Sequence, residues 1–240
     1  MNQLAGNNLR TTFPTEYDRV LAAVRYWFEA KESQLAAVLN AGRSQGGRRD
    51  AVVGGKHLDG LNTLVVDELD RLDVTGLSYL TNARATLPGY YRASKSWDLL
   101  VLRDGEPILV VEYKSMKGSE GKNLNNRIDE VLGVGEDLRA AQEHGLVPRN
   151  LRRAYIFIME TTPEVLTPVG FRGSVGVPDD VFVTASYLDR MAILCSRIRQ
   201  TGLYDMTWAI AACADPIGFY EPDPDVGWVR FKGDLASAFA

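Results

Sequence analysis

The feature that most restricts the fold of this chain is a pair of apolar runs, residues 97–103 and 107–114, separated by Asp104-Gly105-Glu106. Asp-Gly between two strand-like runs is a strong signal for a β-hairpin, because tight hairpin turns need residues that tolerate positive φ. Two later apolar runs, residues 153–161 and 206–214, have the length of buried strands. The sequence therefore predicts a central sheet, of which the hairpin is the most local part.

Segments with apolar residues at helical spacing alternate with these strands, at residues 15–40, 58–72, 124–143 and 184–201. Between them, residues 162–183 are rich in Pro and Gly and are expected to form a loop, and the Asp- and Pro-rich tail 215–225 is expected to be irregular. The expected fold class is α/β, a mixed β-sheet flanked by helices on both sides.

No linker divides the chain, so we expect a single domain over residues 1–240. Its expected parts are an N-terminal helical part (about 15–72), a core (about 96–161) and a C-terminal part (about 184–240).

The composition excludes several classes of protein. Two Cys and two His match neither a disulfide framework nor a His-rich metal site. The chain lacks the roughly 18 consecutive apolar residues of a membrane-spanning helix, and residues 1–10 lack the apolar core of a signal peptide. We therefore expect a protein of the reducing cytoplasm with no membrane partner.

The net charge of −4 argues against a nucleic-acid partner, but the distribution of charge argues for one. Of the 27 basic residues 20 are Arg, the side chain that binds phosphate and guanine with two parallel hydrogen bonds. Windows 41–57, 82–97 and 113–127 each carry a net charge of +3, and all three are expected to be loops. Each window taken alone is also what an ordinary solvated loop looks like.

The hairpin carries the residues that indicate chemistry. Glu112 and Lys114 project from the same side of their strand, and the turn brings Asp98 on the partner strand close to Glu112. Two adjacent carboxylates repel each other unless a cation lies between them, and a hard divalent ion such as Mg²⁺ suits oxygen ligands. Such an ion can polarise a phosphodiester, while Lys114 orients the attacking water and offsets the charge that develops on phosphorus. The alternative is that the three side chains form only a surface cluster of ion pairs, which would stabilise the fold by about 0–1 kcal/mol.

Longer strings around this set carry a family resemblance. Asp98 followed by Glu112-x-Lys114 resembles the PD-(D/E)-x-K nuclease signature, with Trp97 in place of the usual proline. Five strings resemble, in order and spacing, the XhoI family of type II restriction endonucleases: residues 43–48 (RSQGGR), 54–60 (GGKHLDG), 87–92 (LPGYYR), 123–127 (NLNNR) and 185–188 (ASYL). The resemblance runs from about residue 16 to about residue 200, and no matching motif follows Met206.

The resemblance implies a Mg²⁺-dependent homodimer that cleaves palindromic double-stranded DNA and works alongside a cognate DNA methyltransferase. The implied target is CTCGAG, cut after the first C to leave four-base 5′ overhangs. Asp98 and Glu112 match the metal ligands of the motif, and Lys114 matches its catalytic lysine.

Candidate DNA-binding residues come from the basic windows and the family-like strings: Arg43, Gln45, Arg48, Arg49, Lys56, Arg92, Lys95, Lys117, Asn123, Asn125, Asn126 and Arg127. His57 is expected either to contact DNA or to pack in the interior. Two alternatives stay open. One is a repair or junction-resolving nuclease with the same core that reads DNA shape, and the other is a catalytically silent DNA-binding protein.

Overall fold

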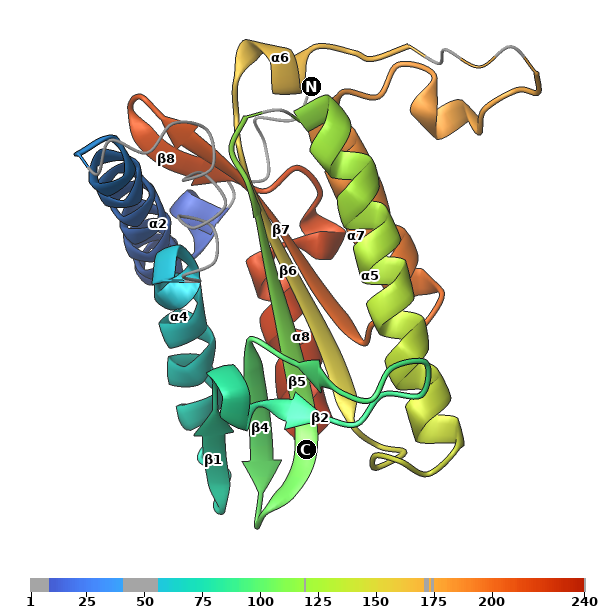
Figure 1. The fold of residues 1–240 in the computed structure, drawn as a ribbon. Helices are drawn as coiled ribbons and strands as arrows, with labels where there is room; N and C mark the ends of the chain where they lie inside the picture. The colour runs from blue at the N-terminus through green and yellow to red at the C-terminus, as the bar shows by residue number, and fades with distance from the viewer. Residues whose placement is uncertain (1–8, 41–55, 119, 171–172, 174, 240) are drawn as a thin grey trace.

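A six-stranded mixed sheet forms the centre of the computed structural model, which describes residues 9–40, 56–118, 120–170, 173 and 175–239 (Figure 1). The strands are β1 (Leu77–Leu80), β4 (Leu99–Arg103), β5 (Glu106–Met116), β6 (Arg152–Glu160), β7 (Met206–Ala214) and β8 (Ile217–Tyr220). They lie in the order β1-β4-β5-β6-β7-β8. Pairing is parallel between β5 and β6 and between β6 and β7, and antiparallel elsewhere in this sheet. The predicted α/β class with a mixed sheet is confirmed.

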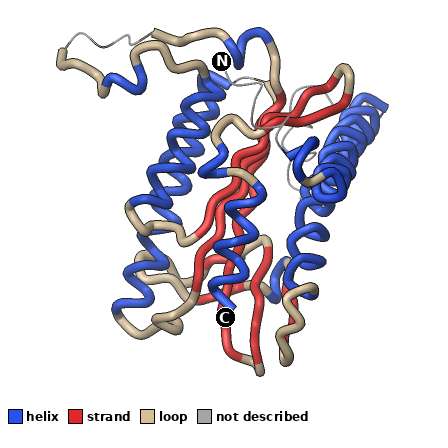
Figure 2. The backbone as a smooth tube through the Cα atoms, turned by 180° about the vertical axis from the view of Figure 1, so that it is seen from behind, coloured by secondary structure: helices blue, strands red, loops and turns tan. Residues whose placement is uncertain are grey.

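Helices cover both faces of the sheet. Helices α2 (Pro14–Asn40), α4 (Asp59–Asp70) and α8 (Trp228–Phe239) pack on one face. In Figure 2, which views the molecule from behind, α8 lies in front of the sheet. Helices α5 (Glu120–Glu143) and α7 (Tyr187–Gln200) cover the other face. The apolar sides of α2 and α7 are both buried against the sheet, so each serves the core of the chain itself.

The hairpin forms as predicted. Asp104 and Gly105 at its turn both have positive φ, 51° and 88°, which is the conformation that Asp-Gly turns supply. Strand β5 continues beyond the predicted end of the second run, to Met116. It is the longest strand and crosses the middle of the sheet, which places its residues 112–114 between the two helical layers.

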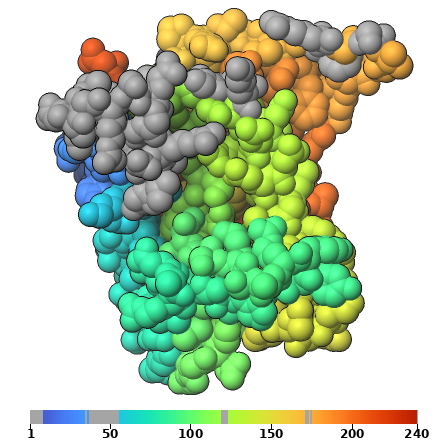
Figure 3. All heavy atoms as spheres, viewed as in Figure 1, coloured from blue at the N-terminus to red at the C-terminus, as the bar shows by residue number. Residues whose placement is uncertain are grey.

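A short two-stranded ribbon lies outside the main sheet. Strands β2 (Thr86–Leu87) and β3 (Lys95–Ser96) pair with each other, and the segment containing them crosses in front of the sheet in Figures 1 and 3. The indole of Trp97 and the side chain of Leu87 anchor this ribbon in a small apolar cluster with Leu138 of α5. The ribbon therefore holds residues 95–98 beside the centre of β5.

Remaining short elements are the 3-10 turns η1 (Lys56–Leu58), η2 (Asn82–Arg84), η3 (Asp180–Phe182) and η4 (Pro224–Val226), and helix α6 (Pro163–Leu166). The expectation of an irregular tail is wrong for residues 217–220, which pair with β7 as strand β8. The ring of Phe219 stacks on Tyr17 of α2 with centroids 4.9 Å apart, so contacts distant in the sequence hold this strand in place. No helix of the described residues is long and apolar enough to cross a lipid bilayer.

Candidate active site

Asp98 and Glu112 meet where the hairpin enters the sheet. Leu99 of β4 pairs with Val111 of β5, so the next position along places Asp98 opposite Glu112. The carboxylate Oδ2 of Asp98 accepts a hydrogen bond of 2.8 Å from the backbone N–H of Tyr113. The juxtaposition that the hairpin predicts is thus present, and the backbone of β5 itself holds the Asp98 side chain.

Strand alternation divides residues 112–114 between the two faces of the sheet. The ring of Tyr113 is buried with α2, α4 and α8, whereas Glu112 and Lys114 point to the side of α5. Tyr113 also donates its hydroxyl to Asn62 of α4, 3.3 Å away. One strand therefore anchors itself in the core through Tyr113 and presents the acid and the lysine on its other side.

Glu112 is 4% exposed and binds two ammonium groups. Lys114 donates to Oε1, and Lys95 donates to Oε2 at 2.9 Å. Burial by itself raises the pKa of Glu112, but the positive charges of Lys114 and Lys95 outweigh it, and the pKa lies below its usual value. Glu112 is therefore held as a carboxylate.

The pKa of Asp98 moves the other way. Asp98 keeps exposed surface, but the atoms packed around its carboxylate withdraw that group from water, which raises the pKa. The negative charge of Glu112 raises it further, while the hydrogen bond from Tyr113 and the charge of Lys114 oppose the rise. The opposed pKa shifts of two neighbouring carboxylates are typical of a functional site.

Lys95 belongs to this site, and the sequence does not predict its position beside Glu112. The sequence places it among the candidate DNA-binding residues, and in the structure its ammonium bonds Glu112 and the carbonyl oxygen of Ser96 and lies 5.1 Å from the centre of the Trp97 ring. Its proximity to Glu112 depends on the β2–β3 ribbon, which no local pattern reveals.

The donor set of Asp98 and Glu112 fits a hard divalent cation. Two carboxylates, one of them charged and nearly buried, leave the other coordination positions to water and substrate, which is how Mg²⁺ is commonly bound. The described residues contain no group of three His, Cys, Asp or Glu side chains that could hold a metal by themselves. Among the described residues, Asp98 and Glu112 are the side chains that would hold such an ion.

The other predicted DNA-binding residues that the structure describes lie on several different elements. Arg43, Gln45, Arg48 and Arg49 lie outside the described residues. Lys56 is exposed at the start of η1, and Lys117 pairs with Glu160 at 3.3 Å. Arg92 pairs with Asp137 of α5 at 3.0 Å, and the same carboxylate accepts the backbone N–H groups of Tyr90 and Tyr91.

The expectation that window 113–127 is a loop is wrong, because β5 runs to Met116 and α5 begins at Glu120. Asn123, Asn125, Asn126 and Arg127 therefore lie on the first turns of a helix. Asn125 and Asn126 are exposed, and Arg127 pairs with Glu130. His57 packs in the interior, with Nε2 2.9 Å from the Ser115 hydroxyl.

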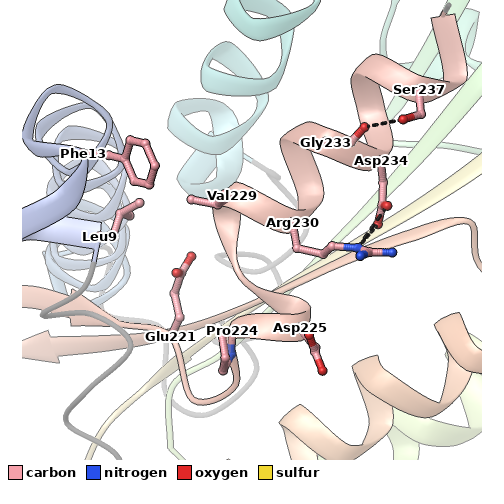
Figure 4. Close-up of a pocket in the computed structure, with 10 residues that line it drawn as sticks. All are labelled: Leu9, Phe13, Glu221, Pro224, Asp225, Val229, Arg230, Gly233, Asp234 and Ser237. Atoms are coloured by element: carbon pink, nitrogen blue, oxygen red, sulfur yellow. Dashed lines mark hydrogen bonds and ion pairs between the residues drawn. The ribbon is translucent and has the colours of Figure 1, made fainter.

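A separate cavity of about 600 Å³ lies between residues 9–13 and α8 (Figure 4). Three of its charged side chains, those of Glu221, Arg230 and Asp234, have partners within the chain. Glu221 accepts hydrogen bonds from Trp208 and from the backbone of Trp228, and Arg230 pairs with Asp234. These contacts are structural, and the cavity lies apart from Asp98 and Glu112.

Comparisons with known proteins identify the class of this chain. A family model described as restriction endonuclease XhoI matches residues 38–218. Type II restriction enzyme XhoI of Xanthomonas vasicola is 32% identical over 194 residues, covering 78% of this chain and 77% of the relative. Type II restriction enzyme BstVI of Geobacillus stearothermophilus is 35% identical over 161 residues (63% of this chain, 71% of the relative).

Type II restriction enzyme AbrI of Azospirillum brasilense is 36% identical over 117 residues (45% of this chain, 51% of the relative). No solved structure matches. The chain is therefore a type II restriction endonuclease. More narrowly, it belongs to the XhoI family, as the five strings predicted.

Proposed function

We propose that this restriction endonuclease cleaves both strands of palindromic DNA in a Mg²⁺-dependent reaction, with CTCGAG as its target. The observation that carries the proposal is the meeting of Asp98, Glu112 and Lys114 at one end of an otherwise apolar hairpin. A hairpin with a purely structural role gains little stability from two carboxylates and an ammonium at that end. The names of the curated relatives support the class of reaction.

Each residue has a separate role in this proposal. Asp98 and Glu112 hold the metal, which supplies Lewis-acid polarisation of the scissile phosphate. The hydrogen bond from Tyr113 fixes the Asp98 carboxylate before DNA arrives, so little reorganisation is needed. Lys114 Nζ, positioned by Glu112, orients the attacking water and offsets negative charge on the phosphate in the transition state.

The proposed assembly is a homodimer. One acid–acid–lysine set cuts one strand, whereas a palindrome presents two equivalent strands related by a two-fold axis. A symmetric dimer places one site on each strand. Because the apolar sides of α2 and α7 are buried in the chain's own core, the dimer contact must use other surfaces. A cognate methyltransferase that protects the host target is the functional partner in this proposal.

The proposal is tested with two plasmids that differ by a single base pair, one with a unique CTCGAG and one in which that site is altered. With Mg²⁺, the first should be converted to full-length linear DNA and the second should stay supercoiled. Cleavage of both plasmids without defined fragments would instead favour a nuclease that reads DNA shape. Accumulation of nicked circles as the main product would contradict the dimer.

A further inference from the structure

Two lysines far apart in the sequence lie together beyond the end of β5. Lys31 of α2 has its Nζ 5.5 Å from the centre of the Trp27 ring, and Lys117 has its Nζ 5.1 Å from the Phe28 ring. The two rings pack edge to face with centroids 4.7 Å apart. The aromatic pair thus holds both ammonium groups on one side of α2, at the end of the strand that carries Glu112 and Lys114.

Positive charge exceeds negative charge at this place. Lys117 pairs with Glu160 at 3.3 Å, but among the described residues Lys31 has no carboxylate within ion-pair distance. Arg127 of α5 is also near enough to repel Lys31, and its own ion pair is with Glu130. Among the described residues, three cations (Lys31, Lys117 and Arg127) therefore share this place with two carboxylates, Glu160 and Glu130.

The pKa of Lys31 reports this imbalance. Burial of its ammonium lowers the pKa to about 8, the charges of Lys117 and Arg127 lower it as well, and Glu160 only partly opposes them. An ordinary surface lysine is solvated and free of such repulsion. The protonated form of Lys31 is therefore less stable than that of a solvated lysine, and an anion bound beside it would stabilise it.

We infer that Lys31 and Lys117 form a binding site for a phosphodiester group of the DNA backbone, separate from the scissile phosphate. The inference rests on the proposed function, since it concerns how the same substrate is held. Lys117 lies three residues beyond Lys114, a distance of about 10 Å along an extended strand. A phosphate bound there belongs to a different nucleotide from the one at Asp98 and Glu112. Figure 1 shows the end of β5 between α2 and the beginning of α5.

Lys31 is the informative residue for a test, because its replacement breaks no ion pair among the described residues. Lys31→Met keeps an apolar stem against Trp27 and removes the charge. Arg103→Met is the matched control, because it removes one positive charge from an exposed position at the opposite end of the hairpin. Thermal unfolding of both variants checks that they fold.

Binding is measured by fluorescence anisotropy on a labelled CTCGAG duplex and on a scrambled duplex, with Ca²⁺ in place of Mg²⁺ to slow cleavage. Loss of one phosphate contact should reduce the slope of log Kd against log salt concentration by about 0.9 and weaken binding by roughly five- to tenfold at 0.1 M salt. Lys31→Met should show both effects equally on the two duplexes. Arg103→Met should match the unchanged protein, and Lys31→Arg should restore the slope.

An unchanged slope in Lys31→Met, with the original protein still binding and cutting DNA, would overturn the inference and leave the proposed function standing. Failure of the original protein to bind or cut either duplex would overturn both. If Lys31→Met does not fold, the comparison of Lys31→Gln with Lys31→Arg replaces it. Equal slopes in those two variants would likewise refute the phosphate site.

Discussion

The carboxylate of Asp98 accepts the backbone N–H of Tyr113 at 2.8 Å, which ties the first acid of the site to the strand that carries the second. Because Tyr113 is the residue between Glu112 and Lys114, this bond fixes the distance between the two halves of the motif. The core contacts of the buried Tyr113 ring make the attachment rigid. Site geometry and hydrophobic core are thus coupled at one residue.

This arrangement predicts that the carboxylates of Asp98 and Glu112 are each essential for cleavage, and that neither is needed for DNA binding. Asp98→Asn and Glu112→Gln keep the size of each side chain while removing its charge. Cleavage of a CTCGAG duplex should fall by about 10²-fold or more in each, since the charge stabilisation of the transition state is lost. Glu106→Gln removes an exposed carboxylate from the opposite end of β5 and should cut normally. Substantial cleavage by Asp98→Asn or Glu112→Gln would refute the assigned roles.

A second prediction concerns competition between Lys95 and the metal. The Lys95 ammonium bonds Glu112 Oε2, so a cation that binds this oxygen must displace it. Lys95→Met should therefore lower the Mg²⁺ concentration that gives half-maximal cleavage, because a positive charge leaves the site. Titration of the cleavage rate with Mg²⁺ measures this, and Arg103→Met serves as the distant charge control. A higher Mg²⁺ requirement in Lys95→Met would show that Lys95 supports metal binding instead.

The third prediction concerns base recognition by the first turns of α5. Asn side chains pair with adenine, and Arg pairs with guanine, through two hydrogen bonds in the major groove. We expect at least one alanine variant among Asn123, Asn125, Asn126 and Arg127 to lose about 1–3 kcal/mol of discrimination between CTCGAG and a scrambled duplex. Arg139→Ala, at the other end of the same helix and paired with Glu136 and Glu143, is the control. Equal loss of affinity for both duplexes in every variant would mean that these residues bind only phosphate.

A fourth prediction links His57 to stability at acid pH. Burial, and then the charge of Lys31, lower the pKa of His57 from 6.5 to about 4. Between these values the unfolded chain binds the proton and the folded chain does not, so the free energy of unfolding decreases as the pH falls below 6.5. The decrease from this group is at most about 1.4 kcal/mol per pH unit.

Urea unfolding at pH 5 and at pH 7 tests the prediction. His57→Gln can keep the hydrogen bond to Ser115 and should lose less stability on acidification than the original chain. His144→Gln, which replaces the other histidine of the sequence, is the matched control. An identical pH dependence in His57→Gln and the original would contradict the prediction.

The sequence predicts the site where its geometry is local and fails where the geometry depends on distant contacts. A two-residue turn and strand alternation suffice to bring Asp98 to Glu112 and to place Lys114 beside it. Lys95 reaches Glu112 only because the ribbon of β2 and β3 folds over the sheet, and that ribbon is held by Trp97 and Leu87 against α5. Nothing in the residues near Lys95 indicates that packing.

The same difference between local patterns and distant contacts explains which elements of the fold the sequence predicts. Helices α2, α4, α5 and α7 follow from apolar residues at helical spacing, although α5 begins four residues earlier than the apolar pattern indicates, at Glu120 rather than residue 124. Strand β8 lies in a stretch rich in Asp and Pro, where local propensity indicates irregular structure. Pairing with β7 and the stacking of Phe219 on Tyr17 outweigh that propensity.

The most direct test of the central claim is to sequence the DNA ends that the protein produces. A plasmid of known sequence is digested with Mg²⁺, in parallel with an identically purified Glu112→Gln preparation, and the 5′ and 3′ ends are mapped. The account predicts ends only at CTCGAG, cut after the first C on each strand with four-base 5′ overhangs, and no such ends from Glu112→Gln. Ends scattered through the plasmid, or the same ends from Glu112→Gln, would contradict it.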